Sequence, residues 1–286
     1  MTMPDAPLGQ PSPPRRRVWA DLGPRIGSAV VLIALTASAL YIGGAFFALV
    51  VSLVFAGAYR EWETMVSRAP LTPFGWMLIA AVALSGLVYP FAGISASIAI
   101  IALACVLALL ARGEGMWWRV AGLVLFGAVI IAAQALRGTS FSGVWAGLYL
   151  GTVVWMTDSA AFFTGRQIGG EKLAPDISPS KTWSGALGGL ALGTTAGLVV
   201  WILVSDSPWW IGLLLSAAIS VLGQLGDLCE SAVKRHFRVK DSGDIIPGHG
   251  GLMDRLDSLT LSVLLVVAIG AMHAGWGAVA EGLLYW

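Results

Sequence analysis

The amino-acid sequence predicts an all-α integral membrane protein with about nine transmembrane helices, its N-terminus in the cytoplasm and its C-terminus on the opposite side. Of its 286 residues, 57% are hydrophobic and only 12% are charged, whereas a soluble domain carries about 25% charged residues. Apolar runs long enough to cross a hydrocarbon layer of about 30 Å recur from Ile26 to the C-terminus. Basic residues fall in alternate loops. These three observations exclude a soluble globular protein.

The first 24 residues are rich in proline and polar residues and predict a disordered cytoplasmic tail over 1–24. Arg15, Arg16 and Arg17 precede the first apolar run, as they would in a signal peptide, and ASA at 37–39 resembles a cleavage site. We favour retention of this run as a helix, because cleavage would leave an even number of spans. Residues 25–137 then form N-terminal membrane helices, and 138–286 form a second membrane region.

The apolar runs define the helices in turn. They cover 26–44, 45–60, 74–92, 93–111, 118–136, 141–163, 185–204, 209–229 and 252–274. Glycines recur every four residues in the seventh helix and predict a face that packs closely on a neighbouring helix: Gly185, Gly189, Gly193 and Gly197. With the N-terminus inside, sixteen of the seventeen basic residues lie on the cytoplasmic side and only Arg137 lies outside, as the positive-inside rule requires.

Acidic residues are concentrated in the C-terminal half of the chain. Between Asp158 and Asp257 there are ten, several within or beside expected helices. Ionisable groups at membrane depth are costly and mark functional sites. The acids before residue 157 are all assigned to tails or loops: Asp5, Asp21, Glu61, Glu63 and Glu114.

Three C-terminal segments carry this charge. Residues 158–185 combine Asp158 with a glycine-rich loop and lysines, which can surround phosphate oxygens but also suit an ordinary cytoplasmic loop. In residues 223–235, Asp227, Glu230 and Ser231 share a helical face that Lys234 continues. Snorkelling of a helix end would explain the cations there but not Asp227.

The third segment, residues 240–258, predicts a site for nucleotide phosphates. Asp254 and Asp257 begin the ninth helix on one face, after a run of glycines. Carboxylate oxygens suit Mg²⁺, which is typically held by one or two carboxylates plus phosphates and waters, and a helix N-terminus attracts anions. His249 is expected either to bind a phosphate or to cap the turn.

These segments resemble the signature of the integral-membrane phosphatidate cytidylyltransferases, also called CDP-diacylglycerol synthases. The likeness spans 27 positions from Ser231 to Asp257, with SAVKR followed after four residues by KDSGDIIPGHGGLMDRLD. Two further blocks agree, QLGD at 224–227 and SPSKTW at 178–183 together with Asp158. The resemblance covers about residues 150–260, whereas the N-terminal half is similar in hydropathy only.

The resemblance implies that CTP and phosphatidic acid are converted to CDP-diacylglycerol and pyrophosphate in phospholipid biosynthesis. It implies a multi-pass, homodimeric enzyme of the bacterial inner (cytoplasmic) membrane, with residues 138–286 as the catalytic region and the active site facing the cytoplasm. The implied cofactor is Mg²⁺ bound by Asp227 and Asp254, with Asp257 as a further candidate and a second metal ion left open. No nucleic acid is expected as a partner, because the basic run 234–240 is short and flanked by spans.

Each candidate residue has an expected role. The anionic lipid phosphate can attack the α-phosphorus of CTP without a dedicated base, so catalysis requires positioning and charge neutralisation. The expected catalytic residues are Asp227, Asp254, Lys234, Arg235, Lys240 and His249, the three cations facing pyrophosphate. The expected substrate-binding residues are Asp158, Ser178, Lys181, Thr182, Ser231, Gly250, Gly251 and Arg255. Three positions depart from many relatives and put substrate affinity in doubt: Phe162, Ser180 and Ser184, where Tyr, Lys and Glu are common.

Two alternatives stay open at this point. A CTP-dependent lipid kinase or a related lipid phosphotransferase would use a similar site. A membrane transporter, a protein of a different class, would place acids near the bilayer midplane and contain an internal repeat. The acids here crowd one membrane face instead, and the sequence contains no repeat.

Overall fold

The computed structural model describes residues 22–243, 245 and 250–286. Of the expected tail 1–24, residues 22–24 belong to the first described helix and the remainder lies outside the described residues. In chain order the elements are α2 (Leu22–Ile42), α3 (Gly44–Ser67), α4 (Pro73–Leu110), α5 (Met116–Arg137), α6 (Ser142–Ile168), β1 (Lys172–Ala174), β2 (Ser178–Thr182), α7 (Trp183–Val204), α8 (Trp209–His236), η1 (Met253–Arg255), α9 (Asp257–Ala274) and α10 (Val279–Leu284).

Six of the described helices are long and apolar enough to cross a membrane, namely α3, α4, α5, α7, α8 and α9. Helix α4 is two helices in one, because Gly93 has non-helical angles, φ 75° and ψ −176°. The chain reverses there, and the hydroxyl of Ser97 donates to the carbonyl of Ser85 at 2.7 Å across the two halves. The boundary between two helices that the sequence predicts at residues 92 and 93 is therefore confirmed.

Helices α6 and α7 pack almost backbone to backbone through the glycine face that the sequence predicts. Gly185, Gly189 and the two glycines that follow at the same spacing are buried. A Cβ atom at residue 189 would lie 2.8 Å from the carbonyl oxygen of Thr157. The predicted close packing is confirmed, and its partner is α6.

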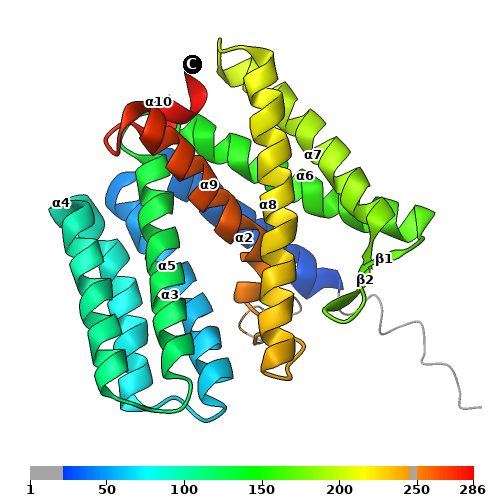
Figure 1. Cartoon of the computed structure of the whole chain (residues 1–286). Coiled ribbons are helices and arrows are strands. Elements are labelled where there is room, and N and C mark those ends of the chain that lie inside the picture. Colours follow the sequence, from blue (N-terminus) through cyan, green and yellow to red (C-terminus); the bar gives the residue numbers. More distant parts are fainter. Residues whose placement is uncertain (1–21, 244, 246–249) are drawn as a thin grey trace, which may run out of the picture.

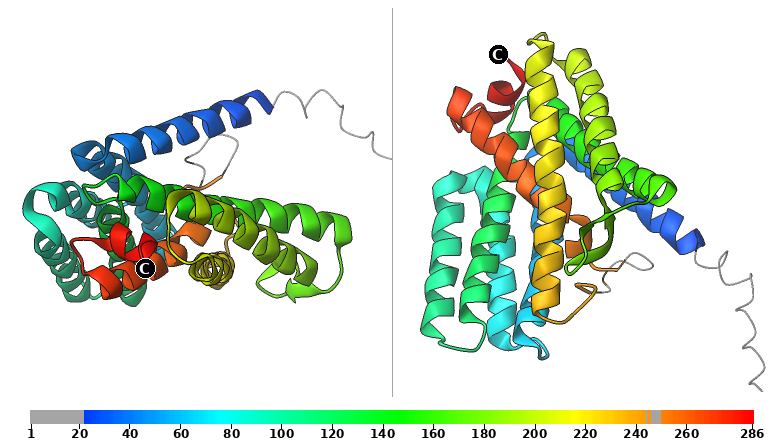
Figure 2. Two further views of the ribbon diagram at one scale, coloured as in Figure 1. Left: turned by 90° about the horizontal axis from the view of Figure 1, so that it is seen from above. Right: turned by 45° about the vertical axis from the view of Figure 1, so that its right-hand side comes forward.

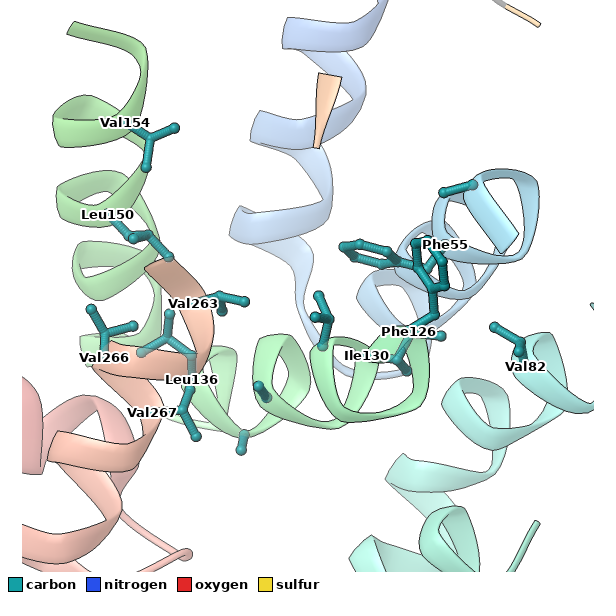
Figure 3. Packing of buried hydrophobic residues seen from close by; sticks show 14 of the residues in the cluster. Phe55, Val82, Phe126, Ile130, Leu136, Leu150, Val154, Val263, Val266 and Val267 are labelled. Atoms are coloured by element: carbon teal, nitrogen blue, oxygen red, sulfur yellow. The ribbon is translucent and has the colours of Figure 1, made fainter. Parts of the chain in front are cut away.

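The molecule has two sides joined by a central pair of helices. Helices α3, α4 and α5 form one side and α6 and α7 the other, with α8 and α9 between them (Figure 1). From above, α8 is nearly end-on, whereas α2 and α6 run across the view (Figure 2). In the hydrophobic core, Phe126 of α5 packs beside Phe55 of α3, and Leu136 of α5 belongs to the same cluster as Val266 of α9 (Figure 3). Helix α5 thus packs both on α3 of its own side and on α9 of the central pair.

Arg137, the exception in the charge pattern, is buried at the end of α5 with 7% of its surface exposed. A Cβ atom on Gly43, which has φ 67°, would lie 2.5 Å from its Nη2, so this close approach requires glycine. The guanidinium donates to four backbone carbonyls, those of Leu40, Tyr41, Gly138 and Ser140. Arg137 therefore satisfies the exposed carbonyls where α2 and α5 end.

Candidate active site

The three charged segments of the C-terminal half meet around one cavity of about 700 Å³. Its walls come from the C-terminal half of α6, the β1–β2 hairpin, the start of α7, the second half of α8, η1 and the start of α9. Sites for small molecules typically measure about 300–1,000 Å³. A smaller cavity of about 520 Å³ is lined mainly by apolar side chains such as Trp210 and Met272, away from these acids.

Opposite charges are balanced in the lining of the large cavity. Three glycines also line the cavity, Gly165, Gly169 and Gly170, and they leave the backbone accessible there. Such a lining suits a ligand that carries phosphates together with a divalent cation. The charged residues are four acids, Asp158, Asp227, Asp254 and Asp257, and four bases, Arg166, Lys172, Lys181 and Arg255.

Asp254 is the most extensively hydrogen-bonded of these acids. Its Oδ1 accepts from Nζ of Lys234 at 2.5 Å, and its Oδ2 accepts from the backbone N–H of Ser242 at 3.1 Å and of Gly251 at 3.2 Å. The Ser242 hydroxyl also donates to Oδ2 at 2.9 Å. Burial alone would raise the pKa of Asp254, but the hydrogen bonds from Lys234 and Ser242 outweigh it and hold the pKa below its usual value. Asp254 is thus an oriented carboxylate anion.

The other three acids have fewer contacts than Asp254. Asp227 forms a close ion pair with Lys181, which reaches across from β2 to α8. Asp158 on α6 accepts from the hydroxyl of Ser258 at 3.2 Å, and Asp257 accepts from the N–H of Ser258 at 2.8 Å. Ser258 therefore links the acid of α6 to the start of α9.

The donor set agrees with a magnesium ion that arrives with a phosphate ligand. Within the described part of the chain, no three His, Cys, Asp or Glu side chains lie close enough together to hold a metal ion by themselves. Mg²⁺ does not require such a cage, because it is usually bound by one or two carboxylates plus substrate phosphates and waters. Asp227 and Asp254 on one cavity supply carboxylates of this kind.

Several expected site residues lie beside the cavity and not in its lining. Lys234 is 8% exposed and bridges Asp254 and Glu230. Arg235 donates to the carbonyls of Ile177 and Val239 at 3.2 and 3.0 Å, which fastens the hairpin to α8. Lys240 is exposed, Ser178 is buried in β2, and Ser231 donates to Asp227 at 3.4 Å. The expected role of His249 lies outside the described residues.

Thr182, Gly250 and Gly251 were expected to bind substrate, and the structure gives each of them a structural role. Thr182 lines the cavity and also caps α7, because its hydroxyl oxygen accepts from the N–H of Gly185 at 3.1 Å. Gly250 has φ 84°, a conformation that favours glycine. Gly251 points its N–H at Asp254. The segment around Thr182 was expected to be a loop, and the structure instead pairs Lys172 with Thr182 in an antiparallel hairpin.

Glu61 lies beside Asp254, and sequence reasoning did not assign it to the site. The sequence assigns it to a loop after a span ending at residue 60, but α3 continues to Ser67 and Glu61 is only 2% exposed. It accepts hydrogen bonds from Ser242, Leu252 and Met253, beside Asp254. The signal was present in Trp62, Met65 and Val66, which continue the apolar face of α3 beyond residue 60.

Comparisons with known proteins identify relatives of this chain by sequence. The model of the cytidylyltransferase family matches residues 24–273. The chain is 38% identical over 263 residues to a phosphatidate cytidylyltransferase of Brucella melitensis, a match that covers 89% of this chain and 95% of the relative. The corresponding protein of Brucella suis is 37% identical over the same coverage. That of Bacillus subtilis is 48% identical over 111 residues, 38% of this chain and 41% of the relative.

Proposed function

The chain belongs to the cytidylyltransferase family, and on that premise we propose that it is a phosphatidate cytidylyltransferase, which makes CDP-diacylglycerol and pyrophosphate from CTP and phosphatidic acid. The observation that carries the proposal is the large cavity, where acids and bases in equal number converge from α6 to α9. Family membership sets the transporter interpretation aside. The lipid kinase interpretation predicts a different product, CDP.

In the proposed reaction, an oxygen of the lipid phosphate forms a bond to the α-phosphorus of CTP. The bond from that phosphorus to the oxygen bridging the α- and β-phosphates breaks, and pyrophosphate leaves with the electron pair. Because the attacking oxygen is already anionic, the chain need not provide a general base. Its contribution is to align the two substrates and to neutralise their charge.

The cavity residues divide this work. We propose that Asp227 and Asp254 bind Mg²⁺, alone or with a second ion, and that the metal when bound neutralises charge on the CTP phosphates. Lys181, Arg166 and Lys172 line the same cavity and are proposed to bind phosphate oxygens. Lys234 orients Asp254 through its 2.5 Å contact.

The membrane arrangement follows from the same premise. We propose nine transmembrane helices, with the N-terminus in the cytoplasm and the C-terminus on the opposite side of the bacterial inner membrane. The cavity then faces the cytoplasm, where CTP is available, while the acyl chains of the substrate stay in the lipid. The separation of α4 into two helices at Gly93 supports this count, and a homodimer is the proposed assembly.

The direct test supplies purified, folded protein in detergent with Mg²⁺, CTP and phosphatidic acid. We expect CDP-diacylglycerol and pyrophosphate in equal amounts, detected by mass spectrometry and a pyrophosphate assay. Formation of CDP without pyrophosphate would favour the lipid kinase. A folded sample that forms neither product would refute the proposed function.

A further inference from the structure

Glu61 and Glu63 are both buried in α3, but they have different partners. Glu63, 1% exposed, accepts from Nε of Arg119 at 2.9 Å and so has a cation beside it. Glu61 instead accepts from the backbone N–H groups of Leu252 and Met253, each at 2.9 Å. A buried carboxylate requires such donors to compensate its desolvation. Glu61 therefore binds the chain immediately before Asp254.

A second route connects Glu61 to the carboxylate of Asp254 itself. The hydroxyl of Ser242 lies 2.9 Å from Oε2 of Glu61 and 2.9 Å from Oδ2 of Asp254. The three groups converge on Gly251, where a Cβ atom would lie 2.8 Å from both carboxylates. Glycine at 251 thus permits the approach, and Ser242 connects the two acids.

We propose that Glu61 is a positioning residue of the active site, which fixes the orientation of Asp254 by holding Leu252, Met253 and Ser242. The proposal rests on the proposed function, because it assigns Asp254 to the magnesium–CTP site. Residues behind a metal ligand typically change metal affinity about 10–100-fold when they are replaced. The N-terminal half of the chain thereby contributes to the active site through Asp254.

The decisive substitution is Glu61→Gln, with Glu63→Gln as its matched control two residues away. Glutamine retains one acceptor but presents an NH₂ donor to groups that are themselves donors. We expect E61Q to raise the half-saturating Mg²⁺ concentration about tenfold. Hydrogen exchange at the amides of Leu252 and Met253, measured without substrate, should become faster. In E63Q we expect a lower melting temperature. The half-saturating Mg²⁺ concentration and the hydrogen exchange of Leu252 and Met253 should be as in the wild type.

Two outcomes would overturn the proposal: wild-type exchange and Mg²⁺ dependence in E61Q, or the same changes in E63Q. If E61Q does not fold, Ser242→Ala tests the second route. That variant should fold and should still require more Mg²⁺ for half-saturation, and an unchanged Mg²⁺ dependence would contradict the positioning role. A wild-type protein without CDP-diacylglycerol synthesis would refute the proposed function instead, while hydrogen exchange would still report on the contact of Glu61.

Discussion

Replacing Lys234 by methionine should lower the melting temperature markedly, because two largely buried carboxylates share this one cation. Nζ lies 3.0 Å from Glu230 and 2.5 Å from Asp254, whose side chains are only 9% and 15% exposed. Removing one partner of a buried ion pair costs about 3–5 kcal/mol. At about 2–4 °C per kcal/mol for a chain of this size, K234M should melt about 6–20 °C lower.

Thermal unfolding in detergent, followed by circular dichroism, measures this difference. Lys240→Met is the matched control, since Lys240 is exposed and a surface substitution usually changes stability by less than about 0.5 kcal/mol. In K234M the carboxylates of Glu230 and Asp254 have lost their cation. Adding Glu230→Gln removes one of these two unpaired charges and should raise the melting temperature again. A K234M melting point within about 2 °C of the wild type would refute the reasoning.

Three further predictions concern the metal and the helix contacts. Asp254→Asn should reduce the turnover rate about 10²–10³-fold at ordinary Mg²⁺, because an amide cannot neutralise a cation. Chelation by EDTA should abolish formation of CDP-diacylglycerol, and added Mg²⁺ should restore it. Gly189→Ala should lower stability by about 1–3 kcal/mol, since the new Cβ atom would lie 2.8 Å from the carbonyl of Thr157; thermal unfolding measures this.

Each of these three predictions can be contradicted by a specific result. Near-normal turnover in D254N would remove Asp254 from the metal site. Full activity in EDTA would mean that catalysis does not use a chelatable metal. Gly27→Ala on α2 is the control for Gly189, because a Cβ atom there has nothing within 4 Å. Equal melting temperatures of the two alanine variants would contradict close packing at Gly189.

The sequence predicts the helices well because apolar length and periodicity are local properties. The break at Gly93 and the glycine face of α7 were both visible in the chain. The β1–β2 hairpin was not, since strands of three and five residues carry little pattern. The apolar face beyond residue 60 indicated that Glu61 belongs to a helix but not which groups it contacts. Its partners lie 181 to 192 residues away, and no local pattern indicates them.

For the site, motif spacing indicated which segments converge but not which side chains contact each other. Asp158, Lys181, Asp227, Asp254 and Asp257 were all predicted from the sequence and all line the cavity. The pairing of Lys234 with Asp254 depends on how α8 meets η1, which only tertiary packing decides. Sequence spacing therefore indicates which segments meet at the cavity, whereas the contacts between their side chains depend on tertiary packing.

The buried guanidinium of Arg137 also bears on how the protein assembles. It hydrogen-bonds the carbonyl of Leu40, 97 residues earlier in the chain. During synthesis this bond can form only after the whole of α5 has emerged and reached the end of α2. Until then the guanidinium has only the carbonyls of Gly138 and Ser140, its neighbours in sequence, from this set of partners, and the carbonyls of Leu40 and Tyr41 lack this donor. The contact between α2 and α5 through Arg137 therefore requires that both helices are already in place.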